Sequence, residues 1–378
     1  MRIAFLVERP TQFEAPFYRF AAQDPAHELR VLFTGGPGVA GPVFDPELGT
    51  AVSWGIDLLG GYPSEVCPAV EASSWLAERL RPERCDLLIA NGYTQPLYRL
   101  GVRIARRAGI ATALRLDSVL FDGSPLRDLA KRLLFATYMK RTYDLFLGVG
   151  SLTLEYLRAF GVPAERTGLF PYAVDVEAFR SCSILSPAER ATVRDRLGVP
   201  AGARVILSLA KLGSREAPWD LLRAFDRLEQ DREDAWLVLA GDGPERKALE
   251  KAAGPRVRFP GYVPYPELPA LYAAADLFAH TAREERWGVS VQEALACGLP
   301  VVASSRVGAA FDLIQPGGNG FLYPAGNDAE LAGRIGDALA LPPERVRQTS
   351  AAILAEWDYT AVWQGLVAAA QKFVRRAA

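Results

Sequence analysis

Short apolar runs alternate along the chain with longer segments whose apolar residues repeat at helical spacing. Runs of three to five such residues are typical of strands in a parallel sheet that is covered on both faces. Two series of runs occur, and the predicted strands are 3–7, 29–33, 87–90, 112–116 and 145–149, then 205–209, 236–240, 257–259, 277–279 and 301–304. Helical segments between them include 95–108 and 125–143.

A strand–helix–strand pattern that occurs twice predicts an α/β protein with two doubly wound domains. The length of 378 residues agrees, because one hydrophobic core rarely serves so long a chain. We expect a first domain at 1–170, a linker at 171–200 and a second domain at 201–358. Residues 359–378 are expected to form a final helix that can cross back to the first domain.

Composition and charge narrow the class of protein. The formal net charge is −1, without a basic tail, so nothing indicates a nucleic-acid partner. The four cysteines are scattered, as is typical of reduced residues in a cytosolic protein. The apolar run near the N-terminus is too short for a signal peptide, and no run approaches the ~20 residues of a membrane span. A soluble cytoplasmic protein is predicted.

One possible exception is the basic segment 125–143, which suits either a solvated helix face or a contact with an anionic acceptor or a membrane surface. The solvated face is the simpler interpretation, and peripheral membrane contact stays open.

The most informative stretch begins at Glu285 and reads ERWGVSVQE to Glu293. Gly288 is expected to open a helix, which Gly298 and then Pro300 end. Glu285 would lie just before this helix, and Glu293 about 7 Å along it from Gly288, at ~1.5 Å per residue. The two carboxylates would therefore bracket the start of one helix.

This arrangement suits a phosphorylated sugar. The free amides near Gly288 and Val289 favour an anion. A carboxylate accepts hydrogen bonds from vicinal hydroxyls, and charged acceptors bind them strongly. The alternative is that Glu285 is an exposed loop residue and Glu293 a solvated helix residue, but the strand–loop–helix frame favours a binding site.

The stretch, with its continuation EALACGLPVVAS, resembles the E-x7-E signature of glycosyltransferase family 4 and related retaining GT-B enzymes. The segments LVLAGDGPERKALE and VRFPGYV resemble the next elements of that family. The resemblance implies the GT-B fold, with two Rossmann-like domains that face each other across a cleft. It also implies a retaining transferase that moves a hexose-type sugar from a nucleotide diphosphate sugar to a hydroxyl of a glycan, lipid or small molecule.

The resemblance assigns roles within the second domain. Glu293 would bind the ribose hydroxyls, Glu285 would act as a catalytic residue on the transferred sugar, and the amides of Gly288 and Val289 would lie near the sugar and diphosphate. The other implied donor-binding residues are Trp287, Ser290, Tyr262 and Val263, of which the last two would border the base. The resemblance implies a UDP- or GDP-sugar donor and no metal or other cofactor.

The chain departs from the family at a basic pair that usually reads R-L-x-x-x-K-G. Lys211 matches the first cation, but Glu216 occupies the second position and Arg215 precedes it. The departing diphosphate needs compensating charge. We therefore expect Lys211 and Arg215 to be catalytic; alternatively, the site binds its donor weakly, or Arg9 or Arg115 supplies the charge.

The first domain lacks the family's Gly-Gly loop and its usual histidine. Thr11 and Gln12 follow the first strand and are candidates for a diphosphate or acceptor loop, with Asn91 after a later strand. Asp117 also follows a strand and is our candidate for contact with the sugar or acceptor hydroxyl, unless it only caps a turn. The two histidines, His27 and His280, are interpreted as structural.

Two other functions fit the same pattern. One is a nucleotide-sugar epimerase, although the scarcity of histidine disfavours acid–base chemistry. The other is a non-catalytic nucleotide-sugar-binding protein, which the acidic Glu216 would explain.

Overall fold

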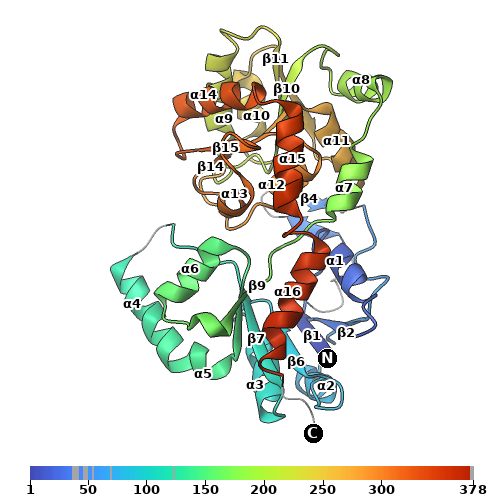
Figure 1. Cartoon of the computed structure of the whole chain (residues 1–378), viewed down its shortest axis with the longest axis vertical. Coiled ribbons are helices and arrows are strands. Elements are labelled where there is room, and N and C mark those ends of the chain that lie inside the picture. Colours follow the sequence, from blue (N-terminus) through green and yellow to red (C-terminus); the bar gives the residue numbers. More distant parts are fainter. Residues whose placement is uncertain (36–41, 46–49, 53–54, 69, 122–123, 375–378) are drawn as a thin grey trace. The chain divides into compact units, whose positions relative to one another are not determined.

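The computed structural model describes residues 1–35, 42–45, 50–52, 55–68, 70–121 and 124–374. The chain forms two compact units (Figure 1). Unit 1 comprises Met1–Gly41, Asp57–Val174 and Trp357–Ala378, and unit 2 comprises Pro42–Ile56 and Asp175–Glu356. The predicted domain ranges differ from these units in two respects. They place residues 42–56 in the first domain, and they begin the second domain only after a linker at 171–200.

Unit 1 is built on a parallel sheet of seven strands in the order β5-β2-β1-β6-β7-β8-β9. The strands are β1 (Arg2–Val7), β2 (Glu28–Phe33), β5 (Ser64–Val66), β6 (Leu87–Ala90), β7 (Ala111–Leu116), β8 (Leu145–Gly148) and β9 (Thr167–Leu169). Every residue of β6, β7 and β8 is buried, as the continuous apolar runs predict. The strand order reverses between β1 and β6, the position where such sheets bind ligands.

Helices cover this sheet. They are α1 (Glu14–Ala21), α2 (Ala72–Arg79), α3 (Pro96–Arg107), α4 (Pro125–Leu134), α5 (Lys140–Thr142), α6 (Ser151–Ala159) and α16 (Tyr359–Gln371), with a π-helical turn η2 (Phe135–Met139) and a 3-10 turn η3 (Ala164–Arg166). The single helix predicted over 125–143 is thus α4, η2 and α5 in succession. The π turn holds two buried residues of this stretch, Phe135 and Met139, and the third, Tyr143, follows α5.

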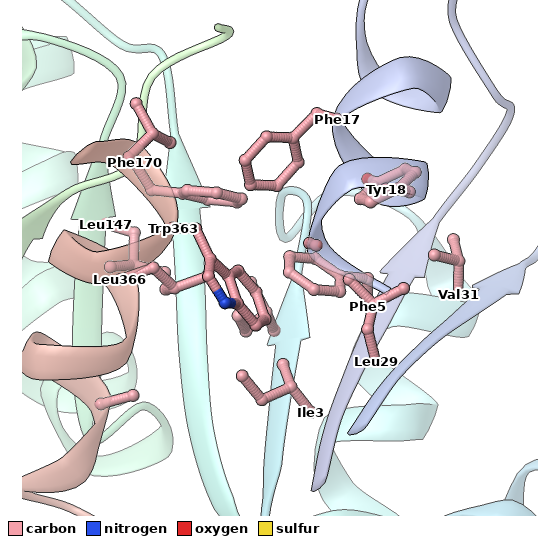
Figure 2. Packing of buried hydrophobic residues seen from close by; sticks show 14 of the residues in the cluster. Ile3, Phe5, Phe17, Tyr18, Leu29, Val31, Leu147, Phe170, Trp363 and Leu366 are labelled. Carbon is pink, nitrogen blue, oxygen red and sulfur yellow. The ribbon is translucent and has the colours of Figure 1, made fainter. Parts of the chain in front are cut away.

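The last helix belongs to the core of unit 1. Trp363 and Leu366 of α16 lie among Phe5, Phe17 and other buried side chains on one face of the sheet (Figure 2). The indole Nε1 of Trp363 donates to Asp24 Oδ2 at 2.7 Å. Residues at the end of the chain therefore complete a core that begins with the first strand.

Unit 2 contains a parallel sheet of six strands in the order β12-β11-β10-β13-β14-β15. These strands are β10 (Arg204–Leu209), β11 (Ala235–Ala240), β12 (Val257–Gly261), β13 (Leu277–His280), β14 (Val301–Ser304) and β15 (Gly320–Tyr323). An antiparallel pair, β3 (Val43–Asp45) and β4 (Thr50–Val52), also belongs to this unit. Here the strand order reverses between β10 and β13.

The helices of unit 2 are α7 (Val176–Cys182), α8 (Pro187–Arg196), α9 (Pro218–Leu228), α10 (Arg246–Ala252), α11 (Leu268–Ala274), α12 (Val289–Ala296), α13 (Gly308–Leu313), α14 (Asp328–Leu339) and α15 (Pro343–Leu354), with a 3-10 turn η4 (Tyr265–Glu267). Side-chain caps mark the starts of α7, α8 and α14. For example, Ser186 and Glu189 form a capping box around the first turn of α8. Across the described ranges, no helix has the length and apolar character of a membrane span.

Candidate functional site

The candidate site of unit 2 lies where the strand order reverses, at the carboxyl ends of β10 and β13. Two loops meet there. Thr281 Oγ1 donates to the carbonyl oxygen of Glu216 at 2.9 Å, and the amide of Arg283 donates to the carbonyl oxygen of Arg215 at 2.8 Å. The loop with the predicted cations and the loop that leads to Glu285 are therefore joined within one unit.

The backbone holds Glu285 in place before α12. Its amide donates to the oxygen of Arg306 at 2.9 Å, and its carbonyl accepts from the amide of Gly308 at 2.9 Å. A Cβ on Gly308 would lie 2.0 Å from the oxygen of Arg286, so this close approach requires glycine. The side chain of Glu285 is half-buried.

Helix α12 begins directly after Gly288, which adopts a φ of 98° and offers no side-chain cap to the helix. A Cβ there would lie 2.9 Å from Val307 Cγ1, so glycine is required by conformation and by space. Trp287 is buried beside it, while Val289 and Ser290 in the first turn are half-buried. An uncapped first turn presents backbone N–H groups and the positive end of the helix to an anion.

Glu293 lies on α12 and is buried, with 5% of its surface exposed. The hydroxyl of Tyr272, on α11, donates to Glu293 Oε2 at 2.8 Å. Burial raises the pKa of Glu293 to about 7, although the bond from Tyr272 acts in the opposite direction. This carboxyl group is therefore poised between its neutral and charged forms near neutral pH.

Aromatic side chains surround Glu293. The rings of Tyr265 and Tyr272 both pack against Phe179 of α7, with centroids 5.8 and 6.2 Å away. Burial raises the pKa values of both tyrosines, and the nearby Glu293 raises them further. Both phenols therefore stay protonated, and Tyr272 acts as a donor to the carboxylate.

The predicted cations lie in the loop after β10. Arg215 does not extend freely: its Nε and Nη2 lie 2.9 and 2.7 Å from Glu216 Oε1. The Arg215 side chain is 59% exposed, whereas that of Glu216 is only 10% exposed. Lys211 is half-buried two residues after the end of β10. A further cation, Arg283, is held by the buried Asp220 at 2.9 Å.

The remaining predicted residues of unit 2 are more dispersed. Tyr262 is exposed and Val263 half-buried, directly after the edge strand β12. His280 ends β13 and is buried, and burial lowers its pKa to about 4, so the ring is neutral. In unit 1, His27 Nδ1 lies 2.9 Å from Asp24 Oδ2.

Unit 1 carries a second polar cluster at its own strand-order reversal. The buried carboxylate of Glu14 binds Arg115 Nη1 at 2.7 Å. Thr11 Oγ1 donates to the same carboxylate at 3.1 Å, and Asn91 Nδ2 donates to it at 3.3 Å. The structure thus brings the predicted Thr11 and Asn91 together through a residue that sequence analysis did not select.

Arg115 also fixes the segment that follows β9. Its Nε donates to the oxygen of Phe170 at 3.0 Å and its Nη2 to the oxygen of Pro171 at 2.7 Å. Gln12 and Asp117 are half-buried in loops at the same edge of the sheet. Arg115 is therefore engaged inside unit 1, which limits it as the alternative cation for a diphosphate.

Two central residues were missed from sequence. Tyr272 lies in an apolar helical segment and reads as a core residue, so only its contact with Glu293 reveals it. Glu14 is in the first turn of α1, three residues after Thr11, which is a usual place for an acidic residue. Among the described residues, no three His, Cys, Asp or Glu side chains gather as a metal site requires.

Comparisons with known proteins find a family and relatives similar to this chain. Residues 189–354 match the family described as "Glycosyl transferases group 1". A "GDP-mannose-dependent alpha-mannosyltransferase" from Mycobacterium tuberculosis is 34% identical over 257 residues, which cover 67% of this chain and 63% of that protein. A "D-inositol 3-phosphate glycosyltransferase" from Thermobispora bispora is 31% identical over 52% of this chain and 47% of its own length. The chain therefore aligns with less than two thirds of the length of the first relative and with about half of the length of the second.

A solved structure is similar over nearly the whole chain. HepE from Anabaena, in complex with UDP, has a TM-score of 0.74 and 21% identity, with 98% of this chain and 100% of that chain covered. The same protein has also been solved with UDP-glucose. This likeness confirms the predicted fold class: the chain has the GT-B fold of two Rossmann-like α/β domains, and its second unit carries the match to the group 1 glycosyl transferases.

Proposed function

We propose that this protein is a retaining glycosyltransferase of the family 4 type, which moves a hexose-type sugar from a UDP- or GDP-sugar to an acceptor hydroxyl. One observation carries the proposal. At the strand-order reversal of unit 2, the uncapped helix α12 bears a buried Glu293 that is oriented by Tyr272. A carboxylate and a helix N-terminus in one site match the ribose and the diphosphate of a nucleotide sugar.

The donor would bind along α12. Glu293 would accept hydrogen bonds from the ribose hydroxyls, and the amides of Gly288 and Val289 would face the sugar and diphosphate. Glu285 would contact the transferred sugar. Of the remaining donor-binding residues, Trp287 and Ser290 would flank this turn, and Tyr262 and Val263 would border the base. The name of the Mycobacterium tuberculosis relative mentions GDP-mannose, and HepE has been solved with UDP-glucose, so both bases remain in the proposal.

The reaction exchanges one bond at the anomeric carbon for another on the same face. The bond to the phosphate oxygen breaks and the bond to the acceptor oxygen forms, while the acceptor proton passes to the departing phosphate oxygen. This course needs no protein nucleophile, and we propose that it needs no metal. The protein would stabilise the charge of the leaving diphosphate through Lys211 and α12.

Arg215 would add to this charge only after it exchanges its bond to Glu216 for one to the phosphate. On the acceptor side, we propose Asp117 as the contact for the reacting hydroxyl, with Thr11, Gln12 and Asn91 lining the same edge of unit 1.

Product analysis tests the proposal. The protein would be incubated with UDP- and GDP-sugars, with water or simple glycans as acceptors, and the products identified by mass spectrometry and by NMR of the anomeric proton. Free nucleotide diphosphate with a sugar of retained configuration is expected, and Glu285→Gln should abolish it. An isomerised nucleotide sugar would indicate an epimerase, and binding without turnover would indicate a non-catalytic binding protein.

A further inference from the structure

His280 is a buried side chain whose hydrogen-bonding groups are unused. It ends β13 with 5% of its surface exposed, and among the described residues neither Nδ1 nor Nε2 has a hydrogen-bond partner. Because its ring is neutral, it has one N–H donor and one acceptor nitrogen. Buried polar groups are nearly always paired, so an unpaired ring beside a candidate site calls for a functional explanation.

The space above Gly288 brings His280 close to Glu285. A Cβ placed on Gly288 would lie 3.4 Å from His280 Nε2 and 3.4 Å from Glu285 Cγ, so these two atoms are separated by no more than twice that distance. The carboxylate follows Cγ directly, so rotation about the side-chain bonds of Glu285 can bring an oxygen within the ~3 Å of a hydrogen bond to Nε2. Because Gly288 carries no side chain, nothing of its own lies between the two groups.

The backbone is fixed on both sides of this gap. His280 pairs with Ala303 in the register of β13 and β14, while the amide and the carbonyl of Glu285 are bonded to Arg306 and Gly308. The side-chain torsions of Glu285 therefore decide where its carboxylate points. A hydrogen bond from the buried ring would hold one carboxylate oxygen and leave the other for a sugar hydroxyl.

Glu216 is the other carboxylate whose charge acts on the His280 ring, together with the opposing charge of Arg215. Its Oε1 accepts from Arg215 Nε and Nη2 at 2.9 and 2.7 Å. Its Oε2 lies 3.2 Å from the position of a Cβ on Gly213. Glu216 therefore acts on the ring through its charge and without a hydrogen bond, which favours Glu285 as the partner.

We propose that His280 is a positioning residue for Glu285, whose carboxylate accepts a hydrogen bond from His280 Nε2–H in the working site. The inference rests on the proposed function, in which Glu285 contacts the transferred sugar. His280 itself does not touch the sugar, because both of its ring nitrogens are buried. It would increase the fraction of donor complexes in which the carboxylate is correctly oriented, and that raises kcat with little change in KM.

Nitrogen-15 NMR of the histidine rings tests the contact without requiring turnover. The chain has two histidines, so His27→Gln leaves only the ring of His280 to observe. Spectra would be recorded with and without UDP-glucose or GDP-mannose. They should show the Nε2–H tautomer, and Glu285→Gln should move its ring-proton signal upfield. Glu284→Gln is the matched control at an exposed neighbouring carboxylate and should leave the signal in place.

Three NMR results would overturn the proposal. The first is an Nδ1–H tautomer under all conditions, because Nε2 would then have no proton to donate. The second is a ring-proton signal that Glu285→Gln does not move. The third is a signal that responds more strongly to Glu216→Gln than to Glu285→Gln, because Glu216 would then be the partner of the ring.

Steady-state kinetics tests the consequence for turnover. His280→Leu removes both nitrogens and should lower kcat about 10- to 100-fold, with the KM for the donor changed less than about twofold. His280→Gln keeps an N–H donor and should restore most of kcat, and thermal unfolding should show that both variants are folded. A raised KM at unchanged kcat, or equal losses of kcat in both variants, would contradict positioning. Absence of transfer by the original protein would instead contradict the proposed function, and the NMR result would still decide the contact.

Discussion

Each unit holds a buried glutamate on a helix that follows a strand next to the strand-order reversal, Glu14 after β1 and Glu293 after β13, but the two lie in opposite electrostatic settings. Glu14 of unit 1 is paired with the guanidinium of Arg115 at 2.7 Å and has bonds from Thr11 and Asn91. Glu293 of unit 2 has one bond, from Tyr272, and in the described part of the chain no cation pairs with it.

We interpret Glu14 as a structural carboxylate and propose that Glu293 is the one that binds a ligand. The charge of Glu14 is compensated inside the protein, and Arg115 uses its other donors on the chain at Phe170 and Pro171. Glu293 keeps an elevated pKa of about 7, because burial penalises its charge and a single phenol cannot offset that. Two hydrogen bonds donated by ribose hydroxyls would supply the further stabilisation that the charged form of Glu293 lacks.

The largest expected effect is on the free energy of unfolding, when the cation that pairs with Glu14 is removed. Arg115→Met leaves the buried Glu14 without its cation, and removal of one member of a buried ion pair typically costs 3–5 kcal/mol. Urea unfolding should show a loss of about that size, partly restored in Glu14→Gln/Arg115→Met. A loss below about 1 kcal/mol would show that Glu14 does not depend on the pair.

The next effect concerns pH and the unpaired glutamate. The pKa of Glu293 rises from 4.5 in the unfolded chain to about 7 in the folded protein. The folded state therefore keeps a proton that the unfolded state releases, and stability falls as pH rises from 4.5 to 7. Relative to Glu293→Gln, the original protein should lose roughly 3 kcal/mol of unfolding free energy between pH 4 and pH 8. Parallel stability curves for the two proteins would contradict this.

A smaller effect is expected at Tyr272. Tyr272→Phe removes the bond that favours ionised Glu293, so the pKa of Glu293 should rise and nucleotide diphosphate binding should weaken by about 1–2 kcal/mol at pH 7. Calorimetric titrations at several pH values should show the binding midpoint moved to higher pH. An unmoved midpoint would mean that Tyr272 only packs against α12.

The smallest effect is expected at the exposed ion pair. Arg215 is largely exposed, so its bond to Glu216 should contribute under about 1 kcal/mol to stability. Arg215→Ala should lower kcat more than it raises KM, and Glu216→Ala should be neutral or mildly activating. If Arg215→Ala leaves kcat unchanged, Lys211 and α12 supply the compensating charge without it.

Periodic features of the chain predicted most of the fold. Continuous apolar runs located β1, β6, β8, β10 and β14, because buried parallel strands leave no polar position. Short strands such as β5 and β9 were not predicted, because three residues are too few to show a hydrophobic pattern. The antiparallel pair of β3 and β4 was missed for the same reason.

The site was predictable only in part. The glycines and glutamates between 285 and 293 have a fixed spacing on one loop and helix, so the sequence shows them. The partners of these residues come from elsewhere: Tyr272 lies 21 positions before Glu293, and Arg115 lies 101 positions after Glu14. Likewise, adjacency in sequence suggested that Arg215 reaches a phosphate, whereas folding places it on Glu216.

Titration of nucleotide diphosphate tests the central claim most directly. Isothermal calorimetry with UDP and with GDP would compare the original protein with Glu293→Ala and with Glu233→Ala, a control at an exposed carboxylate of unit 2. At pH 8, where Glu293 is ionised, Glu293→Ala should weaken binding of the preferred nucleotide by about 1–3 kcal/mol, or roughly 5- to 150-fold. Glu233→Ala should leave it unchanged. Equal affinities for all three proteins would show that Glu293 does not bind the donor.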